Sequence, residues 1–224
     1  MADPSDVRIL IVDDHPIFRE GISAVIQREE NLVIKAEAGS AAEALQLLEE
    51  HKFNLVVSDV TLGGKSGLEL VQDIKALYPD LPVLLLSMHD EDIYAERAIR
   101  AGASGYVMKQ AGSEKLIEAI KTVLSGRTAV SPEITERMLQ AATGRRADQD
   151  KNPVSQLTNR EFEIFQLFGE GLDGNAVAER LNLSIKTVDV HRANIRSKLG
   201  LKNAAELSNF AIRWSVSEHE SASS

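Results

Sequence analysis

The stretch Leu55-Val56-Val57-Ser58-Asp59 is a short apolar run that ends abruptly in a carboxylate. The run is long enough for a β-strand and too short for a helix, and its adjacent valines favour a strand. A strand that is apolar on both faces belongs in a parallel sheet covered by helices on both sides. Functional groups in such sheets gather at the carboxyl ends of the strands, so the run predicts that Asp59 lies at a functional edge.

The rest of the first half repeats this unit. Segments 7–12, 32–38, 82–86 and 105–108 also read as strands. Between the strands, apolar residues at helical spacing predict five helices. They are expected to begin at Pro16, after Ser40, near Leu68, near Glu91 and after Ser113, and Ser40 and Ser113 are expected to cap their helices. Five strands alternating with five helices predict an α/β fold with a doubly wound, five-stranded parallel sheet at residues 1–126.

A linker follows this domain. Pro132 suits the first position of a helix that ends near Ala142. Residues 143–156 combine Gly, Asp, Asn, Pro and mixed charge without an apolar period, which is typical of a flexible segment. We therefore assign residues 127–156 to a helical and flexible linker.

The remaining residues predict a small all-α, four-helix domain at 157–216, with a disordered tail at 217–224. A capping box at 158–161 opens the first helix, and the fourth runs to about Trp214. Ser184 caps the third helix and Gly200 ends it. The second and third helices, joined by Asn182-Leu183-Ser184, describe a helix-turn-helix.

Composition narrows the function classes. The chain has 224 residues, no cysteine and a formal net charge of −9. The lack of thiols suits a reducing cytosol, and we expect a cytoplasmic protein. Two early acids, Asp3 and Asp6, oppose a signal peptide, and no stretch approaches the roughly 20 apolar residues of a membrane span. Residues 1–150 hold 16 Lys/Arg and 25 Asp/Glu, whereas residues 151–224 hold 9 of each. Within 186–202 a local basic cluster faces the single acid Asp189; its cations are Lys186, Arg192, Arg196, Lys198 and Lys202.

Polar side chains stand where the predicted strands end: Asp13 and Asp14, Asp59, Ser87 and Lys109. Because parallel strands end at the same edge, we expect these groups to converge. Three carboxylates repel one another unless a cation lies among them, and a set of hard oxygen ligands favours Mg²⁺. The ammonium and the hydroxyl can hold phosphate oxygens, so Asp59 is predicted to be a nucleophile that forms an acyl phosphate.

With these residues in this order, residues 6–126 resemble the receiver domain of two-component response regulators. The resemblance implies that a sensor histidine kinase transfers a phosphoryl group to Asp59. It also implies Mg²⁺ bound by Asp14, by Asp59 and by the backbone carbonyl of Thr61, with Asp13 acting through water.

The same resemblance assigns a switch. Ser87 and Tyr106 would form the switch pair, the hydroxyl moving to the phosphate while the ring turns inward. Thr61 and His89 match positions that tune dephosphorylation in the family. An alternative interpretation is that Tyr106 is a simple packing residue.

Two positions of this half differ from the family pattern. Leu62-Gly63 stands where Met-Pro is common, and Gln110 follows Lys109 where Pro is common. The first change is expected to loosen the phosphorylation loop. Neither change removes a reacting group.

The third helix of the second half has a distinctive outer face. With Val188 and Ile195 taken as buried, the far face carries small and polar residues and the cations lie at its margins. This distribution fits a helix that enters the major groove of DNA. The alternative is a solvated face on an ordinary bundle. The candidate DNA contacts are Lys186, Thr187, Asp189, Val190, Arg192, Ala193, Asn194, Arg196, Ser197 and Lys198.

The motifs Leu-Thr-x-Arg-Glu at 157–161, Thr187-Val188-x-x-His191 and Lys198-Leu199 resemble the LuxR-type helix-turn-helix. Together the two halves are similar to NarL/FixJ-type response regulators. This implies a transcription regulator that binds promoter DNA, as a homodimer when active. Residues 173–177 lack the lysine common in the family and contain Gly174, and Asp189 stands where lysine is frequent, so we expect modest DNA affinity from one copy.

Two other function classes deserve comparison. A phosphatase with an aspartate nucleophile needs a second acid two residues later, but Thr61 follows Asp59 and His15 follows Asp13. The sequence therefore predicts that the protein is not an enzyme. The other class is a DNA-binding regulator that works without phosphorylation, or a pure protein-interaction module.

Overall fold

The computed structural model describes residues 6–88, 91–142 and 153–221. The chain divides into two compact units, Met1–Leu139 and Gln140–Ser224. Each unit is described by itself. Within the described residues, no helix is both long enough and apolar enough to cross a membrane.

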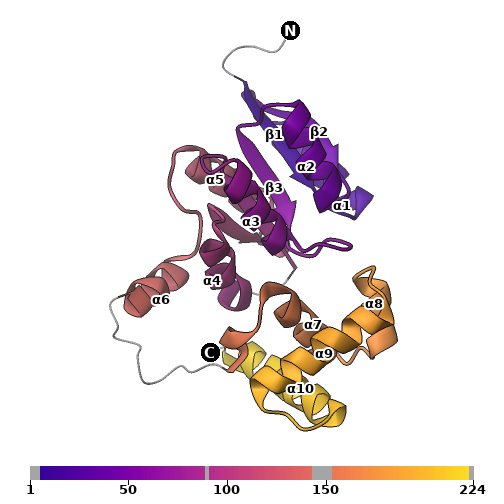
Figure 1. Ribbon diagram of the computed structural model, residues 1–224. Coiled ribbons are helices and arrows are strands. Elements are labelled where there is room, and N and C mark those ends of the chain that lie inside the picture. The colour runs from indigo at the N-terminus through magenta and orange to yellow at the C-terminus, as the bar shows by residue number, and fades with distance from the viewer. Residues whose placement is uncertain (1–5, 89–90, 143–152, 222–224) are drawn as a thin grey trace. The chain divides into compact units, whose positions relative to one another are not determined.

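The first unit is built on a five-stranded sheet in which every pair of neighbouring strands is parallel. Figure 1 shows β1, β2 and β3 of this sheet. The strand order is β2-β1-β3-β4-β5. The predicted doubly wound fold is thereby confirmed, and the sheet order reverses between β1 and β3. The strands are β1 (Val7–Val12), β2 (Leu32–Ala38), β3 (Leu55–Asp59), β4 (Val83–Ser87) and β5 (Gly105–Met108).

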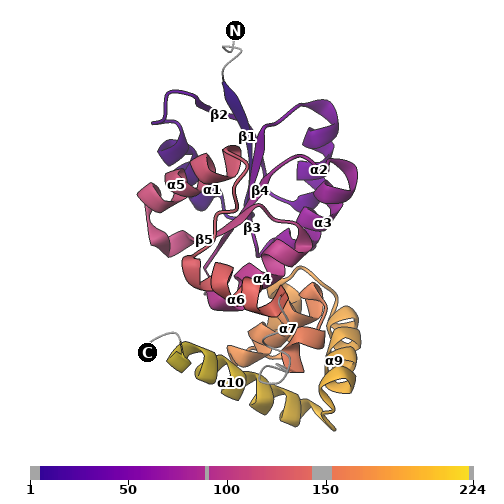
Figure 2. The same cartoon turned by 90° about the vertical axis from the view of Figure 1, so that its left-hand side faces the viewer.

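Helices cover both faces of this sheet (Figure 2). On one face α1 (Pro16–Ile26) and α5 (Ser113–Leu124) pack on alternate residues of the strands, such as Ile9, Val57 and Leu84. On the other face lie α2 (Ala41–Glu50), α3 (Gly67–Leu77) and α4 (Glu91–Ala101). Because helices cover both faces of the central strands β3 and β4, all five residues of each are buried.

The predicted residues begin or cap the helices of the first unit, with one exception. Pro16 lies in the first turn of α1, and the Ser40 side chain accepts a hydrogen bond from the Glu43 N–H. Ser113, however, does not cap α5: Gly112, at φ +89°, holds the capping position and Ser113 is the first helical residue. The prediction was wrong there because the short 3₁₀ turn η1 (Lys109–Ala111) brings the chain into α5 through a conformation that favours glycine.

The segment after α5 stays on the first unit. The Tyr106 N–H donates to the Ala129 carbonyl (2.8 Å), so residue 129 lies along the edge strand β5. The following helix α6 (Pro132–Ala142) begins at the predicted proline. The compact unit therefore extends to Leu139, beyond the boundary at 126 expected from sequence, because these contacts hold the chain against β5. Of the predicted flexible segment at 143–156, residues 143–152 lie outside the described residues. Residues 153–156 instead form a 3₁₀ turn that buries Val154, so this end of the prediction was wrong.

The second unit contains four α-helices after the turn η2 (Pro153–Gln156), among its described residues. The helices are α7 (Asn159–Gly169), α8 (Gly174–Arg180), α9 (Ile185–Leu199) and α10 (Ala204–Ser221). Its core includes an aromatic cluster in which Phe165 lies 5.9 Å from Phe210 and 5.5 Å from Trp214, between ring centroids. Val188 and Ile195 of α9 are fully buried, as predicted.

The turn between α8 and α9 has the expected geometry. Asn182 adopts φ +51°, a left-handed conformation that asparagine tolerates better than most residues. Ser184 then caps α9, accepting from the Thr187 N–H at 3.1 Å. At the other end of the unit, α10 continues to Ser221, so residues 217–221 form helix rather than the predicted tail. No glycine or proline interrupts the chain after Trp214, which explains why the helix continues.

Candidate functional site

Three strands of the sheet deliver charged groups to one point. Asp13 follows β1, Asp59 ends β3 and Lys109 follows β5. The Lys109 Nζ donates to Asp13 Oδ2 at 2.6 Å and to Asp59 Oδ2 at 2.8 Å. These side chains are nearly inaccessible, with exposed fractions of 5% for Lys109, 1% for Asp13 and 6% for Asp59. The predicted convergence at the carboxyl edge is therefore present.

Burial and attraction oppose each other at this edge. Burial raises the pKa of Asp59 to about 6, although the charge and the hydrogen bond of Lys109 pull it down. For Lys109, burial acts against the charge, but attraction to Asp59 and hydrogen bonds to both carboxylates outweigh it and raise the pKa of the ammonium. Two carboxylates facing a single ammonium leave excess negative charge, so the site favours a further cation.

Asp14 is held at the rim of this edge. Its Oδ2 accepts from the Gly63 N–H (3.1 Å), and its Oδ1 lies 2.7 Å from His15 Nδ1. Gly63 is the residue that replaces the proline common in receivers, and a proline would have no N–H to donate. The Gly63 N–H ties the loop to Asp14, and the expected loosening of the loop stays a prediction.

The donor set fits a divalent cation. Ligand atoms of Asp13, Asp14, His15 and Asp59 all lie within 4.8 Å of one another. The three carboxylates are hard oxygen donors, and Mg²⁺ binds through a few carboxylates while keeping several waters. The cluster of Asp13, Asp14 and Asp59 is of the kind typical of receiver magnesium sites.

The other predicted residues of this half flank the edge. Ser87 ends β4 beside β3, is 1% exposed, and follows Leu86, which pairs with Asp59. Tyr106 of β5 is 2% exposed, so its ring is turned inward. The backbone of Thr61 makes a hydrogen bond to Asp59 that lowers the pKa of the carboxyl group. His89 lies outside the described residues.

Two residues near the edge were not predicted from sequence as site residues. His15 contacts Asp14, and Phe18 places its ring centroid 4.6 Å from Lys109 Nζ. His15 directly follows the acidic pair, which is a signal in the sequence. Phe18 lies in the first turn of α1, and no pattern in the sequence links it to Lys109.

The outer face of α9 is a second candidate site. Val190 is 55% exposed, so its side chain is available for an apolar contact. The exposed residues of this face are Lys186, Asp189, Val190, Ala193, Asn194, Ser197 and Lys198, whereas Thr187, Arg192 and Arg196 are half-buried. The predicted face is therefore open except at its margins.

Several of its cations are held inside the second unit. Lys198 Nζ donates to Glu161 Oε2 at 2.6 Å, and Glu161 also closes the capping box of α7. Burial raises the pKa of Glu161, but hydrogen bonds from Lys198 and Thr158 outweigh it and hold the pKa below its usual range. Arg192 lies 5.2 Å from the Phe168 ring centroid and 3.5 Å from Asp189 Oδ1.

In the 173–177 segment, which departs from the family pattern, a side-chain cap stabilises the start of α8. Asp173 caps α8 by accepting from the N–H groups of Asn175 and Ala176, both at 2.9 Å. A Cβ on Gly174 would collide with the Arg192 guanidinium. Glycine leaves room for that guanidinium, whereas a larger residue would displace the flexible end of the Arg192 side chain.

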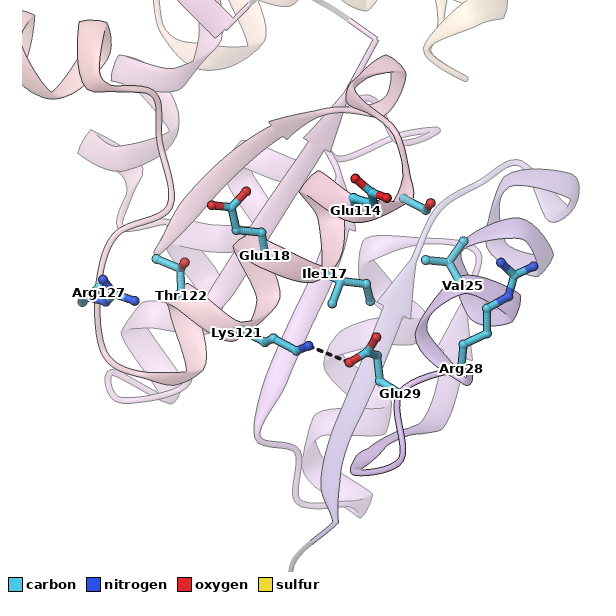
Figure 3. Close-up of a pocket in the computed structure, with 10 residues that line it drawn as sticks. Val25, Arg28, Glu29, Glu114, Ile117, Glu118, Lys121, Thr122 and Arg127 are labelled. Carbon is cyan, nitrogen blue, oxygen red and sulfur yellow. Dashed lines mark ion pairs between the residues drawn. The ribbon is translucent and has the colours of Figure 1, made fainter.

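A hollow of about 600 Å³ lies between α1 and α5 (Figure 3). Lys121 and Glu29 point toward one another across it, with 2.7 Å between Nζ and Oε2. Its lining mixes both charges, and none of the predicted site residues lines it. The hollow is thus separate from the acidic edge.

Comparison with known proteins identifies both units. The model of the response regulator receiver domain matches residues 9–121, and that of the luxR family of bacterial regulatory proteins matches residues 155–211. The oxygen regulatory protein NreC of Staphylococcus carnosus (strain TM300) is 33% identical over 211 residues, covering 92% of this chain and 97% of the relative.

Solved structures agree. A LuxR-family two-component response regulator from Aurantimonas sp. SI85-9A1 is 39% identical, covers 62% of this chain and 99% of its own, and has a TM-score of 0.57. The response regulator RcsB, solved in complex with DNA, is 25% identical over 92% of this chain and 97% of its own, with a TM-score of 0.54. These are regulators rather than enzymes, and the chain belongs to the two-component response regulators that join a receiver domain to a LuxR-family DNA-binding domain.

Proposed function

We propose that this protein regulates transcription under the control of phosphorylation at Asp59 by a sensor histidine kinase. The observation that carries the proposal is the buried contact of Lys109 Nζ with both Asp13 and Asp59. It supplies a carboxylate nucleophile and a fixed cation beside it. Family membership and the absence of a membrane-crossing helix among the described residues are compatible with a cytoplasmic site of action.

The chemistry at the edge is phosphoryl transfer. An Asp59 oxygen forms a bond to phosphorus while the bond between phosphorus and the donor breaks, and the donor leaves with the electron pair. Ser87 ends β4, the strand beside β3, and the Lys109 ammonium lies 2.8 Å from Asp59 Oδ2. Both groups are therefore suited to hold the phosphoryl oxygens. Mg²⁺, held by Asp14, Asp59 and the carbonyl of Thr61, with Asp13 through water, would supply further positive charge to those oxygens.

The response is proposed to follow a population shift. A phosphoryl group on Asp59 draws the Ser87 hydroxyl, and the inward position of Tyr106 is favoured. In the active form two copies associate and place two α9 helices on half-sites about one DNA turn apart. Support for promoter DNA as the partner comes from the open face of α9 and from the solved RcsB complex with DNA.

The DNA contacts are proposed by type. Lys186, Arg192, Arg196 and Lys198 are the phosphate-contacting candidates, and Val190 and Ala193 are the candidates for thymine methyl groups. Thr187, Asp189, Asn194 and Ser197 are the polar candidates for base edges. Exposure of Val190 supports the apolar contacts.

The test compares wild type with Asp59→Asn. Each protein is incubated with acetyl phosphate and Mg²⁺, and the modified residue is located by mass spectrometry. Genomic DNA fragments that the protein captures are sequenced, and the affinity of each protein for these fragments is then measured. We expect one phosphoryl group on Asp59 of wild type, none on the variant, and tighter DNA binding by the phosphorylated protein only. Equal DNA binding by both proteins under all conditions would favour a regulator that works without phosphorylation.

A further inference from the structure

The aromatic ring of Phe18 lies against the ammonium of the acidic edge. The distance from Lys109 Nζ to the Phe18 ring centroid is 4.6 Å, well within the roughly 6 Å range of a cation–π contact. Two of the three N–H donors of Lys109 are taken by Asp13 and Asp59. The ring face attracts the ammonium without needing a third directed hydrogen bond.

Core packing does not account for this ring. Phe18 is 42% exposed, whereas the Lys109 side chain beneath it is only 5% exposed. The two residues share the wall of a small hollow of about 180 Å³ between α1 and α5. The His15 ring meets Phe18 edge-on, with 6.0 Å between centroids. Phe18 therefore covers the lysine and is itself held in place from the side of the acidic pair.

We propose that Phe18 is a positioning residue for phosphoryl transfer to Asp59, acting by holding Lys109. The inference rests on the proposed function. In the reaction with acetyl phosphate, an Asp59 oxygen bonds to phosphorus, the bond between phosphorus and the acetate oxygen breaks, and acetate leaves. Lys109 must then turn from the Asp59 oxygen to a phosphoryl oxygen.

The ring matters most at that moment. Once its oxygen is bonded to phosphorus, the Asp59 carboxyl group no longer carries its own negative charge, and its attraction for Lys109 weakens. Asp13 and the Phe18 ring are the contacts that then keep the ammonium at the edge. An ammonium kept at the edge has only to turn toward the phosphoryl oxygens as negative charge develops on them.

Three variants of the full chain separate the ring from mere bulk. Phe18→Leu keeps an apolar cover without the ring, Phe18→Tyr keeps the ring, and Ile17→Ala alters a neighbouring side chain that is 83% exposed. The readout is the second-order rate constant for phosphorylation by acetyl phosphate at saturating Mg²⁺. We expect Phe18→Leu to lower it about fivefold, the value of one moderate cation–π contact. Phe18→Tyr should retain most of the rate, and Ile17→Ala all of it.

A second measurement tests the contact without any chemistry. The loss of urea midpoint caused by Phe18→Leu is measured in wild type and in Lys109→Met, and the inference expects a smaller loss when the lysine is absent. Equal losses in the two backgrounds, an unchanged rate for Phe18→Leu, or an equal rate loss for Phe18→Tyr would each overturn it. A wild type that accepts no phosphoryl group at Asp59 would instead defeat the proposed function, while the midpoint comparison still judges the contact.

Discussion

The acidic edge of the first unit and the outer face of α9 are both charged, yet they are organised in opposite ways. At the edge, Asp13, Asp59 and Lys109 are buried and contact one another. On α9, Lys186 and Val190 are exposed. The edge, which we propose as the phosphorylation site, takes all its groups from one chain, whereas we propose that DNA completes the face of α9. Single substitutions should therefore have large effects at the edge and small, additive ones on α9.

Removal of Lys109 should give the largest effect. Lys109→Met leaves two adjacent buried carboxylates without their cation, and breaking a buried pair from one side costs about 3 to 5 kcal/mol. We expect a loss of that size in the free energy of unfolding at neutral pH without Mg²⁺, measured by urea denaturation with circular dichroism. The matched control is Lys115→Met, since Lys115 pairs with Glu118 at 3.3 Å on the exposed surface. A comparable loss in both variants would remove the contrast between edge and surface.

The next effect is a pH dependence set by Asp59. Burial raises the pKa of this group from 3.8 to about 6 in the folded protein. Between these values the folded state binds more protons than the unfolded state, so stability falls as pH rises through the window. A difference of about two units corresponds to about 3 kcal/mol. Below about pH 4 the carboxyl group is protonated in both states, so the destabilisation is absent there.

The measurement is the free energy of unfolding of metal-free protein between pH 4 and pH 7, for wild type and for Asp59→Asn. The amide does not titrate, so the variant should lack this fall in stability and be the more stable protein at pH 7. Glu118→Gln serves as control, because Glu118 is exposed. Parallel curves for wild type and Asp59→Asn would contradict a raised pKa at the edge.

The contrast between the two regions also explains what the sequence could predict. The positions of Asp13, Asp59 and Lys109 followed from apolar runs that end in charge, because a parallel sheet brings all its strand ends to one edge. The sheet and the helix-turn-helix followed from the same periodic patterns. The contact of Phe18 with Lys109 could not be predicted in this way, because it joins residues 91 positions apart through side-chain geometry alone.

On α9 the helical spacing of apolar residues identified the buried face, but it did not show which basic side chains form contacts within the second unit. Lys198 appeared to be a free phosphate contact, yet it donates to Glu161 of another helix. The end of α10 was missed for a related reason: Ser and Glu after Trp214 are weak signals of either helix or coil, and no breaker decides between them. Side-chain contacts between distant residues, and helix ends without a clear stop signal, therefore could not be predicted from the sequence.

Replacing Lys198 should have a smaller effect on stability than replacing Lys109. Its charge-assisted bond to the buried Glu161 carboxylate should contribute about 1 kcal/mol, allowing for the partly exposed ammonium. We expect Lys198→Met to destabilise the second unit by that amount, followed by fluorescence of Trp214, the protein's only tryptophan. Lys186→Met should change stability by less than about 0.5 kcal/mol. If both variants unfold like wild type, Lys198 belongs with the open DNA-contacting cations and not with the internal contacts.

The smallest effect concerns how α9 meets DNA. Lys186 is exposed in the first turn of α9, where the partial positive charge of the helix start also favours a phosphate. If it neutralises one phosphate per bound copy, Lys186→Gln should lower the slope of log affinity against log salt by about 0.9 per copy. Lys115→Gln makes the same change in net charge on the first unit and should leave the slope unchanged. Equal shifts from both variants would mean that DNA responds to the charge of the whole chain and that the α9 face has no local role. A shift from Lys186→Gln alone would place one phosphate contact on this helix.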